Sequence, residues 1–159
     1  MAPRSLSFAT ALGRMHLAWT AEGICSLQFA EGLDRDDATG APGWVLEAVR
    51  RLMAHLAGHP QSLGDIPLDR AGWTPFQQRV AAVLRATRPG QTLSYGDVAL
   101  LAGSPGAARA VGQAVKANPV LILVPCHRVV AAKGPGGWSA FGSPERKARL
   151  LELERPTAG

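Results

Sequence analysis

Residues 74–90 carry the clearest structural signal in the chain, a complete set of helix start and stop signals. Thr74 supplies a capping hydroxyl, Pro75 stands at the first helical position, and Gln77 lies where a capping box requires a side-chain acceptor. Apolar side chains then recur at helical spacing until Pro89-Gly90 ends the pattern. We therefore predict a capped amphipathic helix that buries one face in the core of a folded domain.

Two more short helices are predicted directly after this one. Ser94 can cap a helix over residues 95–102, which Gly103 ends. Ser104-Pro105 repeats the cap-then-proline start for a third helix that runs to about Lys116. Two short helices with so tight a connection are typical of a helix-turn-helix, and also of a plain antiparallel helix pair. The pattern alone leaves both interpretations open.

The first part of the chain has a different pattern. Three short segments between residues 6 and 30 are rich in apolar and aromatic residues and are separated by turn signals, which predicts a small antiparallel sheet. Apolar residues at helical spacing then predict one amphipathic helix that ends at Gly58. A stretch with prolines and glycines but no period follows. We therefore expect an N-terminal β-rich lobe over residues 1–72 and a C-terminal domain over residues 73–159.

The charge distribution favours a polyanionic partner for the second half of the chain. The chain is 47% hydrophobic and 18% charged, which is typical of a folded globular protein, and its net charge is +5. Residues 74–130 contain six Lys and Arg residues against one acidic residue, Asp97. A basic segment of this kind is suited to binding nucleic acid. The alternative is a basic, solvated surface that binds no polyanion.

The N-terminus and the cysteines indicate the compartment. Arg4 and Arg14 interrupt the apolar runs at the start of the chain, so we expect neither a signal peptide nor a membrane span, and a cytoplasmic protein. Cys25 and Cys126 lie far apart, and neither has the Cys or His spacing of a zinc site. We expect both to be thiols and expect no bound metal.

Cys126 is the candidate nucleophile. The apolar run over residues 120–125 predicts a buried strand that ends at this cysteine, next to His127 and Arg128. Neighbouring positive charge and hydrogen-bond donors lower the pKa of a thiol, whereas apolar burial raises it, so a reactive thiol and an inert packed one are both possible from local context. The remaining histidines are predicted to be ordinary surface or core residues: His16, His55 and His59.

Residues 118–130, NPVLILVPCHRVV, closely resemble the active-site signature of the O6-alkylguanine-DNA alkyltransferases, also called methylated-DNA–protein-cysteine methyltransferases. The resemblance covers residues 74–154 strongly, including a closing helix that begins at Ser143-Pro144, and the N-terminal lobe only in outline. It implies an α+β fold, with a small β-rich N-terminal lobe and a helical C-terminal lobe that contains the helix-turn-helix and the active-site cysteine. It also implies a monomer without an obligate protein partner.

The resemblance implies a direct-reversal repair reaction. Cys126 would displace the alkyl group from O6 of guanine in DNA, with O4-alkylthymine as a second candidate substrate. His127 would take the thiol proton through a water, and Glu154 would orient His127, although Glu152 is close enough in sequence to fill that position. A thioether has no good leaving group, so each molecule would repair one lesion, without a cofactor or metal.

The remaining implied roles concern the substrate and the DNA. Asn118 would brace the active-site turn, and Tyr95 would donate a proton to the guanine ring. Duplex DNA would bind through its minor groove, with the damaged nucleotide flipped out of the stack and Arg109 in its place. The residues implied to contact DNA are Tyr95, Ala107, Ala108, Arg109, Ala110, Gly112 and Arg128. Those implied to hold the flipped base are Arg109, Leu121, Val129, Trp138 and Ser139.

Two departures and two rival functions remain open. Leu121 stands where the family often has proline, and Trp138 replaces the usual tyrosine or phenylalanine, so the preferred alkyl size is undetermined. A non-catalytic alkyltransferase-like protein would carry tryptophan in place of the reactive cysteine, which the presence of Cys126 opposes. A cysteine hydrolase would release its product repeatedly and would need no DNA-binding helix.

Overall fold

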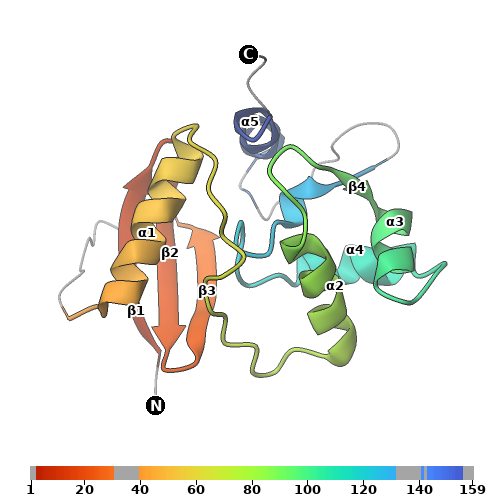
Figure 1. Ribbon diagram of the computed structural model, residues 1–159, viewed down its shortest axis with the longest axis horizontal. Helices are drawn as coiled ribbons and strands as arrows, with labels where there is room; N and C mark the ends of the chain where they lie inside the picture. The colour runs from red at the N-terminus through yellow and green to blue at the C-terminus, as the bar shows by residue number, and fades with distance from the viewer. Residues whose placement is uncertain (1–2, 31–39, 132–140, 142, 156–159) are drawn as a thin grey trace.

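The computed structural model describes residues 3–30, 40–131, 141 and 143–155. Its elements confirm an α+β fold, with an antiparallel three-stranded sheet followed by helices. Figure 1 shows the sheet and α1 on one side of the molecule and α2, α3 and α4 on the other, with α5 between them at the top. Among the described residues, no helix combines the length and apolar character needed to cross a membrane.

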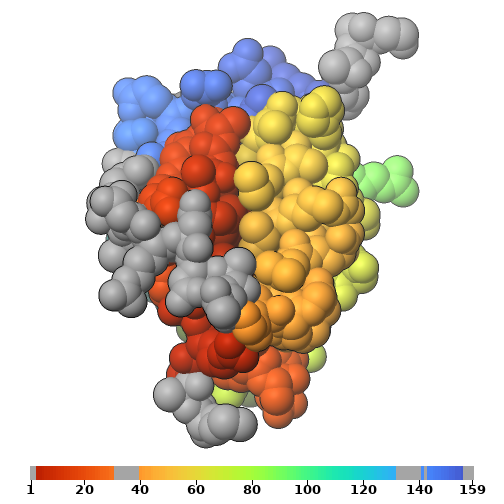
Figure 2. Space-filling view, turned by 90° about the vertical axis from the view of Figure 1, so that its left-hand side faces the viewer, coloured from red at the N-terminus to blue at the C-terminus, as the bar shows by residue number. Residues whose placement is uncertain are grey.

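The sheet consists of β1 (Arg4–Thr10), β2 (Gly13–Thr20) and β3 (Gly23–Phe29), in that spatial order. This meander agrees with the predicted one, and Leu17 of β2 lies opposite Leu6 on one side and Leu27 on the other. Helix α1 (Gly43–Leu56) covers one face of the sheet, as Figures 1 and 2 show. Apolar side chains of the sheet and of α1 belong to one continuous hydrophobic core that extends into the helical part.

Helices α2 (Pro75–Arg85) and α3 (Tyr95–Leu101) begin where their capping signals predict. In α2, the Thr74 hydroxyl accepts from the backbone N–H of Gln77, and the Gln77 side chain accepts from that of Thr74, so the capping box is complete. Ser94 caps α3 in the same way, with Asp97 as its partner.

Helix α4 (Ala108–Lys116) begins three residues later than predicted. Gly106 has a φ of 84°, a left-handed conformation that cannot belong to a helix, and Ala107 donates its backbone N–H to Ser104. Pro105 therefore lies in a turn between two helices instead of opening the second one. Helices α3 and α4 still pack against each other, so the predicted helix-turn-helix arrangement is present with a longer connection.

The predicted strand over residues 120–125 is wrong. Only an isolated bridge joins Val120 to Leu27, and the chain then turns sharply at Ile122, whose φ is 74°. A β-branched residue in the left-handed region is strained, and such strain persists only where surrounding contacts impose it. The segment is buried and apolar as expected, but it forms a tight turn instead of an extended strand.

The last elements close the structure around this turn. A 3₁₀ turn, η1 (Cys126–Arg128), follows it, and β5 (Val129–Val130) then pairs in parallel with β4 (Leu93–Ser94). Helix α5 (Pro144–Leu153) begins at its predicted cap and contacts η1. Figure 2 shows α5 in blue, lying against the sheet in red and the yellow segment at the end of α1. The two halves of the chain therefore meet beneath α5.

We predict that Thr74→Ala destabilises the protein by about 1 kcal/mol, because the first turn of α2 loses its capping acceptor. Urea unfolding measures this change as a lower midpoint. Thr74→Ser is the matched control, since it keeps the hydroxyl and should recover most of the loss. Equal destabilisation by both substitutions would show that the methyl group, and not the cap, matters.

Candidate active site

Cys126 lies at the start of η1 and is fully buried. The side-chain amide of Asn118 donates to its Sγ at 3.1 Å and to the carbonyl of Val124 at 2.9 Å. The oxygen of the same amide accepts from the backbone N–H of Val120 at 3.0 Å. One side chain thus links both arms of the tight turn to the sulfur, which explains how the strained conformation at Ile122 is held.

The surroundings of Cys126 have opposing effects on its charge. Burial raises the pKa of the Cys126 thiol to about 12, while the hydrogen bond from Asn118 and the charge of Lys147 act in the lowering direction. Lys147 is buried on α5, donates from Nζ to the carbonyl of Val129 at 3.2 Å, and has a pKa lowered to about 8 by burial. At neutral pH the group at Cys126 is therefore a thiol, which needs a base before it can attack.

Glu154, directly after α5, is the centre of a buried polar network. Its Oε1 accepts from Nε2 of His127 at 2.8 Å and from Nε of Arg128 at 3.0 Å. Its Oε2 accepts from Nε2 of His55 at 2.7 Å and from Nη2 of Arg128 at 2.9 Å. Burial opposes the negative charge, but the hydrogen bonds from the histidines and Arg128 outweigh it and hold the pKa of Glu154 well below its usual value.

This network defines the state of His127. Because Glu154 is ionised, Nε2 of His127 must carry the proton that they share, which leaves a lone pair on Nδ1. No partner for Nδ1 is found among the described residues. Burial lowers the pKa of His127, so the imidazole is neutral at physiological pH and Nδ1 is able to accept a proton. The rings of Phe141 and His127 pack edge to face, with centroids 6.2 Å apart.

The structure brings Asn118, Cys126, His127 and Glu154 together, as the sequence predicted. Glu152 is exposed, so Glu154 is the carboxylate that meets His127. The position of Arg128 corrects a prediction, because this residue was expected to contact DNA. Its side chain is buried instead, bound to Glu154 and, through Nη1, to the carbonyl and hydroxyl of Thr87.

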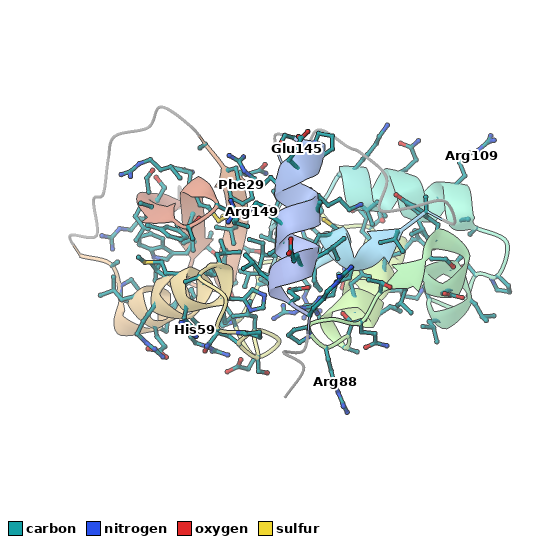
Figure 3. The ribbon with its side chains drawn as sticks, turned by 90° about the horizontal axis from the view of Figure 1, so that it is seen from above. Phe29, His59, Arg88, Arg109, Glu145 and Arg149 are labelled. Atoms are coloured by element: carbon teal, nitrogen blue, oxygen red, sulfur yellow. The ribbon has the colours of Figure 1, made fainter. Side chains whose placement is uncertain are left out.

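Tyr95 and α4 form the other side of the site. Tyr95 is half-buried, and its pKa is raised by burial and by the proximity of Cys126. A Cβ on Gly112 would lie 3.9 Å from the Tyr95 ring, an ordinary van der Waals distance, so α4 packs beside Tyr95 at this position. Figure 3 shows Arg109 projecting from the outer end of α4, away from the body of the protein. Ala107 and Ala108 are half-buried beside it, and Ala110 is exposed.

The residues predicted to hold a base are only partly accounted for. Leu121 and Val129 are both fully buried in the core, and the backbone carbonyl of Val129 already accepts from Lys147. Trp138 and Ser139 lie outside the described residues. The other thiol, Cys25, is half-buried and lines a cavity of about 370 Å³ that also reaches Asn118.

Two site residues were missed by sequence reasoning. His55 was predicted to be ordinary, yet it donates to Glu154 from the last turn of α1. Lys147 was expected only to belong to the closing helix, although its buried charge acts on Cys126. Their positions in the sequence could have revealed them. Both residues occupy the apolar stripe of an amphipathic helix, where an ionisable side chain needs a buried partner. No group of three or more metal-ligating side chains is arranged for a metal ion within the described part of the chain.

A buried thiol, a histidine and an ionised carboxylate beside a helix-turn-helix define a DNA-binding protein with a nucleophilic cysteine. The family model for the DNA-binding domain of 6-O-methylguanine DNA methyltransferase matches residues 75–156. The methylated-DNA–protein-cysteine methyltransferase of Mycobacterium bovis is 47% identical over 121 residues, 76% of this chain and 71% of the relative. This chain belongs to that methyltransferase family.

Solved structures agree over nearly the whole chain. A variant of Mycobacterium tuberculosis OGT superposes with a TM-score of 0.82 at 38% identity, covering 99% of this chain and 96% of that one. Mycobacterium tuberculosis OGT in complex with DNA superposes with a TM-score of 0.78 at 39% identity, covering 94% and 92%. The fold is therefore shared along both the sheet and the helical part.

We predict that Glu154→Gln destabilises the protein by about 3–5 kcal/mol, because it leaves the buried charge of Arg128 without a counter-charge. Denaturant unfolding at neutral pH measures this loss, and Glu152→Gln, which changes an exposed residue two positions earlier, should leave the midpoint unchanged. The pKa of Glu154 is lowered from 4.5, so the wild type loses this contribution as the pH falls below about 4.5, a loss that the variant cannot show. Parallel acid profiles would contradict the role of this carboxylate.

Proposed function

We propose that this chain repairs DNA by transferring the alkyl group of O6-alkylguanine irreversibly to its own Cys126. The observation that carries the proposal is the juxtaposition of three groups: a buried thiol, a neutral imidazole with a lone pair on Nδ1, and an ionised carboxylate on the other imidazole nitrogen. This is the order of nucleophile, base and orienting group that activates a weak nucleophile.

In the proposed step, the thiol proton of Cys126 moves to Nδ1 of His127 through a water. The sulfur lone pair forms a bond to the alkyl carbon, the bond from that carbon to O6 breaks, and its electrons return to the purine. Tyr95 donates a proton to the guanine ring as negative charge develops there. The proton held by His127 then returns through water to the Tyr95 oxygen. The products are unmodified guanine and a thioether at Cys126, which offers no good leaving group, so one molecule repairs one lesion.

The groups around the sulfur support the transient thiolate. Asn118 donates to Sγ, and the ammonium group of Lys147 lowers the pKa of Cys126 through its charge. Both effects act more strongly in a buried site than in water. As the proton leaves, the negative charge on sulfur forms beside a cation and an N–H donor that are already in place, which is the preorganisation that a displacement reaction needs.

DNA binding is proposed to use the outer surface of α4. The exposed Arg109 and the small side chains beside it suit close approach to the minor groove, with Arg109 filling the space of a flipped nucleotide. We assign recognition and chemistry to residues 73–159, with residues 1–72 as the supporting lobe. A DNA substrate and a free thiol nucleophile both suit the cytoplasm.

We predict that Cys126→Ser abolishes transfer of a labelled methyl group from O6-methylguanine duplex DNA while leaving DNA affinity within about threefold of the wild type. A hydroxyl is a far weaker nucleophile than a thiol in this setting, and the small change in volume preserves the turn. Cys25→Ser is the matched control and should transfer normally. If Cys126→Ser still transferred the methyl group, or if Cys25→Ser did not, the assignment of Cys126 as the acceptor would be refuted.

We predict that Arg109→Ala slows repair of duplex DNA by about tenfold or more, and slows attack on free O6-methylguanine base much less. The reason is that only the duplex reaction requires extrusion of a nucleotide, which costs a few kcal/mol. Single-turnover kinetics on both substrates measures the difference. Arg149→Ala removes the same charge from the exposed surface of α5 and should change neither rate. Equal losses on both substrates would contradict a role in flipping.

A further inference from the structure

We propose that His55, on the last turn of α1, is a positioning residue for the alkyl-transfer site and so makes the N-terminal lobe a functional part of that site. The inference rests on the proposed transfer to Cys126. The family model begins at residue 75 and does not include His55. This component of the active site therefore lies outside the segment that the family model matches.

The contact between His55 and Glu154 is short and fully buried. Nε2 of His55 lies 2.7 Å from Oε2 of Glu154, and the two side chains are 0% and 1% exposed. Glu154 is 99 residues away in sequence, so the contact joins the end of α1 to the end of α5. The same two ends also approach at Gly58, where an added Cβ would lie 3.6 Å from Leu153. A buried hydrogen bond to a carboxylate is stronger than a neutral one.

The protonation state of His55 follows from its second partner. Its Nδ1 accepts the backbone N–H of Gln61 at 3.0 Å, so Nδ1 carries a lone pair and Nε2 carries the hydrogen. His55 is thus a neutral donor aimed at Glu154. A backbone N–H cannot rotate or lose its proton, so the loop after α1 fixes the tautomer of His55, just as a carboxylate or carbonyl fixes that of a metal-bound histidine.

The consequence lies in how the four donors divide between the two carboxylate oxygens. Arg128 donates to both oxygens, His127 only to Oε1, and His55 only to Oε2. Each oxygen therefore has two donors, and the carboxylate cannot rotate without losing one of them. By occupying Oε2, His55 keeps Oε1 in the direction of His127. That holds the His127 ring in the orientation and tautomer that leave its Nδ1 lone pair as the base.

The test compares three full-length variants with the wild type. His55→Phe keeps an aromatic ring but removes both hydrogen bonds, whereas His55→Gln restores an N–H donor. His59→Phe, at an exposed position four residues later, is the control (Figure 3). Single-turnover methyl transfer to Cys126, affinity for lesion-bearing duplex DNA and thermal unfolding are measured for each protein. Ring ¹⁵N chemical shifts report the tautomers of His55 and His127 in the wild type and of His127 in the His55 variants.

We expect His55→Phe to slow transfer by about tenfold or more, the size of effect usual for residues that orient an active-site ligand, with DNA affinity unchanged. His55→Gln should recover most of the rate, His59→Phe should behave as the wild type, and both histidines of the wild type should be Nε2–H tautomers. A wild-type rate for His55→Phe, or no rescue by glutamine, would overturn the inference. If His55→Phe does not fold, an Nδ1–H tautomer of His55 in the wild type would overturn it. A wild type that never methylates Cys126 would instead refute the proposed function.

Discussion

The buried carboxylate of Glu154 is the interaction on which the rest of the site depends. Placing a negative charge in a protein core is costly unless it is paired and fully hydrogen-bonded. Here four donors from three residues satisfy it, and Arg128 supplies the compensating charge. Those donors come from α1 and from η1, while the acceptor directly follows α5, so one charge connects the three segments that surround the thiol.

The second arrangement that positions the thiol is the tight turn before Cys126. The turn before Cys126 contains a strained Ile122 and is held by the amide of Asn118, which reaches both the turn and the sulfur. Because η1 follows this turn without a break, the contact of His127 with Glu154 and that of Asn118 with Cys126 fix successive residues of one short segment. The thiol thus has a defined position relative to its base, which suits a single direct displacement.

Much of this structure was predictable because it depends on local chemistry. Capping signals at Thr74, Ser94 and Ser143 predicted three helix starts, and short apolar and aromatic segments between turn signals predicted the sheet. The motif around Cys126 predicted the family and the meeting of Asn118, Cys126, His127 and Glu154, although their catalytic roles remain predictions. These features need only nearby residues or a recognised pattern.

The errors arose where a side-chain contact that composition does not reveal, either within a turn or with a distant residue, decides the outcome. The apolar run before Cys126 was predicted to be a strand because composition cannot reveal a turn imposed by the side chain of Asn118. Arg128 was expected to contact DNA from the family resemblance, whereas Glu154, 26 residues away, binds it in the core. His55 was overlooked for the same reason, since its partner lies 99 residues further along the chain.

The proposed reaction requires that one sulfur accept one alkyl group permanently. Peptide mass spectrometry after incubation with an excess of duplex DNA carrying O6-methylguanine tests it most directly. We predict one added methyl group per protein molecule, located on the peptide that contains Cys126 and absent from that of Cys25, with repair ending once every molecule is modified. An unmodified Cys126, or more lesions repaired than protein molecules present, would contradict the account.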